Sequence, residues 1–250
     1  MTFKQLNNLN GKVVVIAGGC GQVGFESAKQ LSNKGAKIIS LVRRDLEKSQ
    51  VMMDTLLNGS YAILASITDT NSIKAAVEEI RLKEGKCDIL VNAAGITRSI
   101  PPTEDLSDEL FDEIVNVNLK GVYVTIREFR ELLSLSGDGL IINMSSVAGS
   151  RASQSNLAYG AAKAGVDLIT KTLAKALAPT IRIVGIAPSF LENPTSGAIK
   201  PPGANDRIAL NSPLKRVGQA NDIASTIVSI AMDIRFITGQ TIIVDGGFTL

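Results

Sequence analysis

The stretch that decides the fold is Lys12-Val13-Val14-Val15-Ile16-Ala17, which runs directly into Gly18-Gly19-Cys20-Gly21-Gln22-Val23-Gly24. The first six residues form a β-branched apolar run, typical of a buried strand, and a helical pattern follows over Phe25–Asn33. Glycines let a backbone approach a pyrophosphate closely, and the first N–H groups of a helix attract phosphate. The segment therefore predicts a dinucleotide site that contains Gly18, Gly21, Gln22, Val23 and Gly24. An ordinary strand-to-helix turn is the alternative.

Apolar runs alternate with longer amphipathic stretches along the whole chain of 250 residues. This alternation predicts an α/β protein with a doubly wound Rossmann fold, in which a seven-stranded, mostly parallel sheet carries helices on both faces. Residues 1–250 are expected to form one domain. The expected strands are Lys12–Ala17, Ala36–Val42, Tyr61–Ala65, Asp88–Asn92, Leu140–Ser145, Ile181–Ala187 and Thr241–Val244.

The end of the second expected strand indicates which dinucleotide is bound. An NAD site usually places an acidic residue there, about 20 residues after the glycines, to accept a hydrogen bond from the ribose. This chain instead has Val42 followed by Arg43 and Arg44. Because a guanidinium can pair with a 2′-phosphate, the two arginines predict a preference for NADP(H), with NAD(H) possible. The alternative is a solvated arginine pair.

Composition excludes several classes of function. The formal net charge is +2 and the basic residues are scattered, so we expect no nucleic-acid partner, and no apolar run is long enough for a membrane partner. The stretch from Met1 to Lys12 lacks the apolar core of a signal peptide, which predicts a cytoplasmic protein. Histidine is absent, which excludes Ser-His-Asp triads. Cys20 and Cys87 are expected to be small buried thiols, and no metal site is expected.

Without histidine, acid–base chemistry needs another side chain, and Tyr159 is the best candidate. Lys163 follows it by four residues, so a helix would place the ammonium and the phenol on the same face. A phenol has a pKa of about 10, and a neighbouring cation lowers it, whereas burial alone would raise it. The pair therefore predicts a phenol activated by a lysine.

Taken together, these residues resemble the short-chain dehydrogenase/reductase family, in its compact form of roughly this length. The similarity runs from Leu9 to the C-terminus. The motifs that carry it are Asn92-Ala93-Ala94-Gly95, Val117-Asn118-Leu119-Lys120-Gly121, Met144-Ser145-Ser146, the Tyr159/Lys163 pair, Pro188, Thr238-Gly239-Gln240 and Val244-Asp245-Gly246-Gly247.

The resemblance implies a role for each catalytic candidate. Tyr159 would be the general acid/base, and Ser146 would hydrogen-bond the reacting oxygen. Ser146 is chosen over Ser145 because only its spacing to Tyr159 matches the family. Lys163 would bind the nicotinamide ribose and depress the pKa of Tyr159, while Asn118 would hold a water in the proton path. A helix cap or kink is the alternative role for Asn118.

The resemblance also extends the cofactor site beyond the phosphate turn, to Ser66, Ile67, Asn92, Ala93, Ala94, Gly95, Tyr159, Lys163, Pro188 and Ser189. Three positions depart from the family pattern. Gln22 replaces the middle glycine of the fingerprint, Ser66 replaces an acidic residue that would bind adenine, and Ser189 replaces the glycine after Pro188. These departures imply altered phosphate geometry, looser adenine binding and a side chain near the nicotinamide amide.

Outside the motifs, the stretch Ser189 to Pro213 is rich in Pro, Gly, Asn and Ser and predicts a substrate lid, with a surface loop as the alternative. Arg98 and Arg151 follow strand ends and could bind an anionic substrate, although arginines in loops are usually solvated.

The function indicated is an oxidoreductase that transfers a hydride between NADP(H) and a small-molecule secondary alcohol or ketone. β-Ketoacyl-carrier-protein reductase and polyol or sugar-acid dehydrogenase are the leading subtypes. The alternatives are a non-catalytic NADP(H)-binding regulator, or an epimerase or dehydratase with a tightly bound cofactor. The resemblance also implies a homo-oligomer, a tetramer or dimer.

Overall fold

Seven strands form one sheet in the computed structural model, which describes residues 7–97, 105–151, 156–192 and 203–250. Every neighbouring pair of strands is parallel, and the order across the sheet is β3-β2-β1-β4-β5-β6-β7. The strands are β1 Val13–Ala17, β2 Lys37–Val42, β3 Tyr61–Leu64, β4 Ile89–Asn92, β5 Gly139–Met144, β6 Ile181–Pro188 and β7 Thr241–Val244. The predicted doubly wound fold is confirmed.

The helices connect these strands and cover both faces of the sheet. They are α1 Gln22–Asn33, α2 Leu46–Asp54, α3 Thr70–Glu84, α4 Asp108–Val115, α5 Gly121–Leu135, α6 Leu157–Leu177, α7 Ala204–Asn211 and α8 Ala220–Met232. A π-helical turn, η1 (Asn116–Lys120), joins α4 to α5, and a 3₁₀ turn, η2 (Val147–Gly149), follows β5. None of the helices in the described residues is long and apolar enough to cross a membrane.

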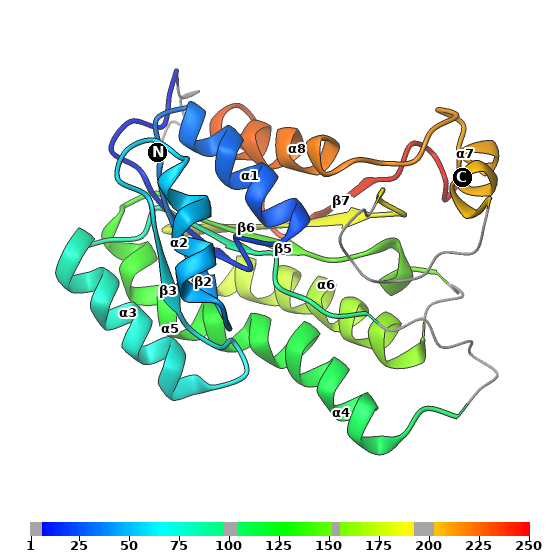
Figure 1. Ribbon diagram of the computed structural model, residues 1–250, viewed down its shortest axis with the longest axis horizontal. Helices are drawn as coiled ribbons and strands as arrows, with labels where there is room; N and C mark the ends of the chain where they lie inside the picture. The colour runs from blue at the N-terminus through cyan, green and yellow to red at the C-terminus, as the bar shows by residue number, and fades with distance from the viewer. Residues whose placement is uncertain (1–6, 98–104, 152–155, 193–202) are drawn as a thin grey trace.

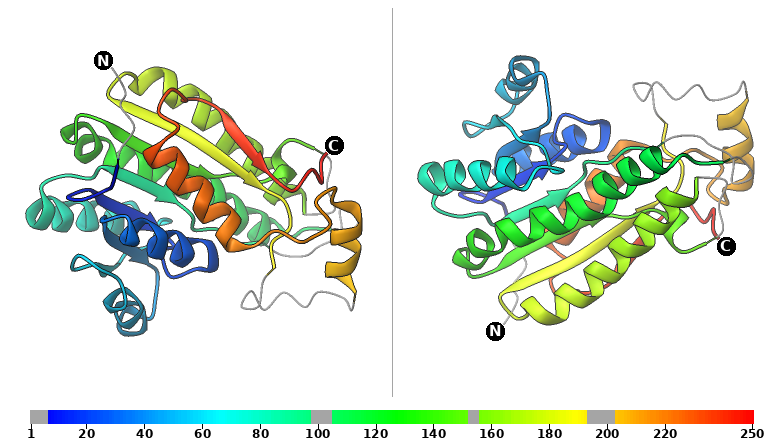
Figure 2. Two further views of the ribbon diagram at one scale, coloured as in Figure 1. Left: turned by 90° about the horizontal axis from the view of Figure 1, so that it is seen from above. Right: turned by 90° about the horizontal axis from the view of Figure 1, so that it is seen from below.

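The core has two parts, one on each side of the sheet (Figures 1 and 2). Helices α3, α5 and α6 cover one face, where Phe129 and Leu132 are fully buried. Helices α1 and α8 cover the other face, where Leu31 and Ile227 are fully buried. The central strands are consequently apolar on both faces, which explains their continuous rather than alternating hydrophobic runs.

The strand order reverses between β1 and β4. The candidate functional residues follow the carboxyl ends of strands on both sides of this reversal. In an open parallel sheet, ligands bind outside the carboxyl ends of the strands at such a switch point. The glycine turn after β1 and the segments after β4, β5 and β6 all begin at this edge. Helix α7 and the C-terminus lie at the same end of the molecule (Figures 1 and 2).

Three expectations are corrected here. Helix α1 begins at Gln22 rather than Phe25, with Gly21 of the glycine turn as its N-cap. Cys20 is only half-buried, since it lies in the turn beside Ser40, whereas Cys87 is fully buried as expected. The stretch predicted as an irregular lid contains helix α7, and its residues 193–202 lie outside the described part of the chain.

Candidate active site

The turn after β1 has the geometry of a phosphate-binding turn. Gly18 has φ +81°, and a Cβ there would lie 2.9 Å from the backbone of Ala94. A Cβ on Gly24 would lie 2.1 Å from the Gly18 carbonyl oxygen, so this contact requires glycine. Gly21 is the N-cap of α1, and no side chain caps the helix. The first N–H groups of α1, from Gln22 and Val23, therefore face outward and suit a phosphate.

Gln22, which stands where the family has glycine, makes a long-range contact. Its side-chain amide donates a hydrogen bond to the backbone carbonyl of Glu192. Glu192 also accepts a hydrogen bond from the side chain of Gln219 at 3.3 Å. The departure from the fingerprint thus ties the phosphate turn to the segment that leaves β6.

The two arginines after β2 are exposed and available. Arg43 makes no hydrogen bond or ion pair within the described part of the chain, and Arg44 lies 4.0 Å from the Asp45 carboxylate. After β3, the Ser66 hydroxyl is 2.9 Å from that of Thr68. Ile67 packs against Gly121, where a Cβ would lie 2.7 Å from its side chain. The adenosine end of the site therefore offers one free guanidinium and no carboxylate at position 66.

The end of β4 is stabilised by a buried chain of hydrogen bonds. The Asn92 amide donates to Asn143 at 2.9 Å, and Thr125 donates to the Asn92 oxygen at 2.7 Å. Asn143 in turn donates to Thr170 at 3.0 Å. These contacts join β4, β5, α5 and α6. Asn92 therefore stabilises the scaffold, and the backbone of Ala93 and Ala94 that follows it passes beside Gly18 of the glycine turn.

Asn118 lies in the π-helical turn η1 and is fully buried. Its side-chain oxygen accepts from the Ile96 N–H at 3.2 Å, and its amide donates to the carbonyls of Ile96 and Ile114 at 2.8 and 3.0 Å. Three backbone groups therefore bind the side chain, which uses both amide hydrogens and leaves one acceptor position on its oxygen. π-Helical turns of this kind are frequent at functional sites.

Tyr159 and Lys163 lie on the first turns of α6 and face the end of β5. Asn156 is the N-cap of the helix and accepts from the Tyr159 N–H at 2.8 Å. The Lys163 ammonium is buried, donates to the Met144 carbonyl at 2.7 Å and lies 5.6 Å from the centroid of the Tyr159 ring. The spacing of four residues thus places cation and phenol side by side, as predicted.

Ser146, rather than Ser145, reaches the phenol. Ser146 hydrogen-bonds the Tyr159 side chain and also accepts from the Ala148 N–H at 3.2 Å. The Ser145 hydroxyl is buried and donates to the Lys163 carbonyl at 3.3 Å. Gly95 completes the group, since a Cβ there would lie 2.8 Å from the Asn118 oxygen and 3.9 Å from the Lys163 ammonium. Ser146, Tyr159, Lys163 and Asn118 therefore surround one region.

The electrostatics differ from the prediction at one point. Burial raises the pKa of Tyr159, and the hydrogen bond from Ser146 opposes this effect only in part. Burial also lowers the pKa of Lys163 to about 8, against a smaller opposite effect of Asp167. The lysine was expected to depress the pKa of the phenol, but its ammonium is bound to the Met144 carbonyl, and desolvation dominates both groups.

Comparison with known proteins identifies the family. A family model described as enoyl-(acyl carrier protein) reductase matches residues 21–249. A 3-oxoacyl-[acyl-carrier-protein] reductase of Thermotoga maritima is 34% identical over 97% of this chain and 99% of its own length. The chain belongs to the short-chain dehydrogenase/reductase family.

Further relatives of this family cover almost the whole chain. A 3-oxoacyl-[acyl-carrier-protein] reductase of Escherichia coli is 31% identical over 96% of the chain and 98% of its own length. The solved structure of aldohexose dehydrogenase from Thermoplasma acidophilum matches with a TM-score of 0.85 and 27% identity, covering 96% of this chain and 95% of that one. As a short-chain dehydrogenase/reductase, the protein is an NAD(P)-dependent oxidoreductase that acts on CH–OH or keto groups.

The far side of the short-chain dehydrogenase/reductase site is formed after β6. Pro188 is the last residue of that strand, and the Ser189 hydroxyl donates to the Asp245 carbonyl at 3.4 Å. Arg151 is exposed, and its guanidinium stacks 5.4 Å from the Phe248 ring and donates to the Phe248 carbonyl at 3.3 Å. Ser189 and Arg151 therefore both contact the C-terminal segment. Arg98 lies outside the described residues.

Sequence reasoning missed several residues that support this site. Asn143 interrupts the apolar run of β5, and this polar position was the available signal for the Asn92 network. Asn156 precedes Tyr159 by three residues, which is the spacing of a helix N-cap. The Glu192 carbonyl, which binds Gln22, is a backbone group and left no signal in the sequence.

Proposed function

We propose that this short-chain dehydrogenase/reductase transfers a hydride between NADP(H) and a secondary alcohol or ketone, with Tyr159 as the general acid/base. The observation that carries the proposal is the placement of Tyr159 beside both Lys163 and Ser146 at the end of β5. A substrate oxygen bound between the Ser146 and Tyr159 hydroxyls would accept a proton from the phenol during reduction. The raised pKa of Tyr159 keeps that proton in place near neutral pH.

The remaining site residues would bind and orient the cofactor. The free N–H groups at the start of α1 would hold the pyrophosphate, and Gly18 and Gly24 keep their approach clear. Lys163 would donate to the ribose hydroxyls, and Asn118 fixes the backbone of Ile96 beside them. When bound, the nicotinamide carries the hydride, so the protein needs only to position the reacting carbon and to supply the proton.

The preference for NADP(H) rests on Arg43. Its guanidinium is exposed at the end of β2, with no partner in the described part of the chain, where a 2′-phosphate would lie. The Ser66 hydroxyl is engaged with Thr68, and position 66 carries no carboxylate that would repel a phosphate. Bidentate pairing between guanidinium and phosphate supports the phosphorylated cofactor.

For the substrate, we propose a 3-oxoacyl thioester as the first class to test, because the curated relatives reduce 3-oxoacyl groups on a carrier protein, as their names state. An aldose or a related sugar is the second class, because a structural neighbour is an aldohexose dehydrogenase.

The first experiment compares melting temperatures without ligand and with NADP⁺, NADPH, NAD⁺ and NADH at equal concentration. A ligand at 100 times its Kd stabilises the folded state by about 2.7 kcal/mol. We expect a shift with the phosphorylated pair. A shift with NAD⁺ and NADH alone would overturn the cofactor assignment, and no shift with any nucleotide would favour a non-catalytic role.

The second experiment tests the chemistry. Oxidation of NADPH with an acetoacetyl thioester, and reduction of NADP⁺ with aldohexoses, are followed for the parent protein and for Tyr159→Phe. We expect the variant to lose about 10²–10⁴-fold in kcat while the melting shift with NADPH is retained. Tyr123→Phe is the matched control, because Tyr123 is exposed on α5. Equal turnover by Tyr159→Phe and the parent would defeat the assignment.

A further inference from the structure

Gln22 is the first residue of α1 and stands where the short-chain dehydrogenase/reductase pattern has glycine. A glycine has no side chain, whereas the amide of Gln22 donates a hydrogen bond to the Glu192 carbonyl. Glu192 lies four residues after Pro188, the last residue of β6. This bond therefore joins the phosphate turn, which follows β1, to the segment that follows β6.

The Glu192 end of this bond is held in place without Gln22. The Glu192 N–H donates to the Gly218 carbonyl at 2.8 Å, and the Gly218 N–H donates to the Phe190 carbonyl at 3.2 Å. The Gln219 amide also donates to the Glu192 carboxylate at 3.3 Å. The segment after β6 is thus paired with the chain that leads into α8, and these contacts present the Glu192 carbonyl to Gln22.

The Gln22 end of the bond is fixed by α1 itself. Ala28 and Leu31 on this helix are fully buried in the core. The Gln30 amide donates to the side chain of Asn221, at the start of α8, at 2.8 Å. Because both backbones are already fixed, forming the bond orders only the side chain of Gln22. We therefore expect the bond to persist in the folded protein.

The place of this bond beside a bound dinucleotide follows from the fold. Under the proposed function, the adenosine end lies near Arg43 after β2, the pyrophosphate at the start of α1, and the nicotinamide near Ser189 after β6. Gln22 is then next to the middle of the ligand, and Glu192 follows Ser189 by three residues. Helices α1 and α8 cover one face of the sheet, and α6, which carries Tyr159, covers the other (Figure 1). The bond and the proposed acid therefore lie on opposite sides of the ligand.

We propose that the hydrogen bond between Gln22 and Glu192 closes the α1 side of the NADP(H) site and slows release of the bound nucleotide. Gln22 is then a positioning residue that sets the rate of cofactor exchange. The inference rests on the proposed function, because it requires a dinucleotide at the start of α1. Opening this side breaks one neutral hydrogen bond, which changes a rate constant by roughly 3- to 10-fold.

Displacement kinetics test the inference directly. NADPH, or NADH if only that nucleotide binds, is bound to the full chain, and excess oxidised nucleotide is added in a stopped-flow instrument. The loss of fluorescence gives the release rate. We expect release from Gln22→Gly to be roughly 3–10 times faster than from the parent. Equal release rates would overturn this inference alone, whereas a parent that binds neither nucleotide would overturn the proposed function and this inference with it.

Gln22→Asn distinguishes two ways in which the amide could act. The shorter side chain keeps an amide beside the proposed pyrophosphate position, but it lacks the methylene group needed to reach the Glu192 carbonyl. We expect this variant to release the nucleotide as fast as Gln22→Gly. Release at the parent rate would mean that the amide binds the phosphates directly, and it would overturn the proposed closure.

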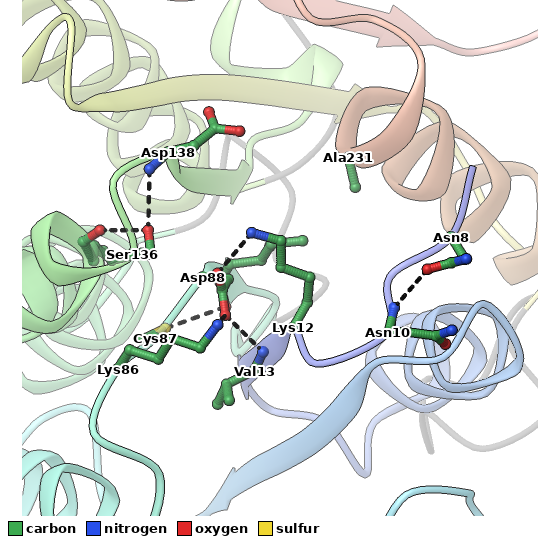
Figure 3. Close-up of polar contacts among 12 residues, drawn as sticks. Asn8, Asn10, Lys12, Val13, Lys86, Cys87, Asp88, Ser136, Asp138 and Ala231 are labelled. Atoms are coloured by element: carbon green, nitrogen blue, oxygen red, sulfur yellow. Dashed lines mark hydrogen bonds and ion pairs between the residues drawn. The ribbon is translucent and has the colours of Figure 1, made fainter. Parts of the chain in front are cut away.

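Two controls separate this bond from a general loss of stability. Gln30→Ala removes a hydrogen bond from the same helix to α8 and leaves Gln22 in place. Lys86→Met weakens the buried cluster at the amino end of the sheet, where Asp88 is bound by Lys12 and Lys86, each at 2.9 Å (Figure 3). Both variants should lower the melting temperature and keep the parent release rate. Release from either control as fast as from Gln22→Gly would show that loosening alone is sufficient, and it would overturn the inference.

Discussion

At the residue scale, Lys163 is a lysine whose side chain the fold removes from water. It is buried among the residues proposed to be catalytic, and this burial lowers its pKa. Its pKa is about 8 in the folded protein, against an ordinary value of 10.5. Between these values the unfolded chain holds more protons than the folded one, so the free energy of unfolding rises with pH over this interval.

We therefore expect the cofactor-free protein to gain on the order of 3 kcal/mol from Lys163 between about pH 8 and pH 10.5. Below pH 8 both states are protonated, and the burial penalty is present in full. Urea denaturation of the parent and of Lys163→Met at pH 7.5 and pH 10 measures the difference. Identical pH dependence in the two proteins would show that Lys163 does not titrate in this interval.

Arg43 gives the second prediction for a single residue. Replacing it with Ala removes a charged hydrogen bond worth about 1.5–3 kcal/mol, so NADPH should bind about 10- to 100-fold more weakly while NADH is unaffected. Titration calorimetry with both nucleotides measures this. Lys48→Ala, which removes another exposed cation from the adjacent α2, controls for a general loss of positive potential. Equal losses for NADPH and NADH would mean that Arg43 does not bind the 2′-phosphate.

At the element scale, the start of α6 determines where the proposed acid lies. Asn156 caps the helix through the N–H of Tyr159, so the cap holds the backbone of the reacting residue. Asn156→Ala should cost about 1 kcal/mol of stability and should also lower kcat, because the first turn of the helix loosens. Asn156→Asp keeps an acceptor and is the control. Melting curves and turnover are measured together. A loss of stability without any change in kcat would separate the cap from catalysis.

The same scale shows which parts of the fold can be predicted from sequence. The strands agree within about a residue at each end, because β-branched runs buried on both faces leave an unambiguous pattern. The helix α7 and the π-helical turn η1 were not predicted. The sequence around α7 is rich in Pro and Gly, and a π-helical turn uses ordinary helix-forming residues. The Pro and Gly residues around α7 therefore predict a loop, and the residues of η1 predict an ordinary α-helix.

The candidate site also has some features that could be predicted from the sequence and others that could not. The relation of Tyr159 to Lys163 follows from helical spacing, and it could be predicted. The hydrogen bond of Lys163 to the Met144 carbonyl depends on how α6 packs against β5, and so does the direction of the pKa shift of Tyr159. The contact between Gln22 and Glu192 joins residues 170 positions apart. Such contacts depend on tertiary packing, which no local pattern encodes.

At the scale of the whole molecule, β7 forms an edge of the sheet and remains partly uncovered. Ile243 on this strand is 49% exposed, and Leu168 on the adjacent α6 is 65% exposed. Thr241, two residues before Ile243, donates to Asp167, which precedes Leu168, at 2.8 Å, so β7 and α6 are in contact near these two apolar residues. Exposed apolar side chains beside an unpaired strand edge are typical of a surface that associates with another chain.

We expect this edge to pair with a second copy of the chain, because closed symmetric homo-oligomers are the commonest assemblies of soluble proteins. Sedimentation velocity should show a dimer or tetramer for the parent, and Ile243→Lys should shift it to smaller species, since a charge placed in an apolar contact is costly to desolvate. Leu82→Lys is the control, because Leu82 is an exposed leucine on α3 and not on this surface. A monomeric parent would exclude association, and dissociation by Leu82→Lys instead of Ile243→Lys would move the interface to α3.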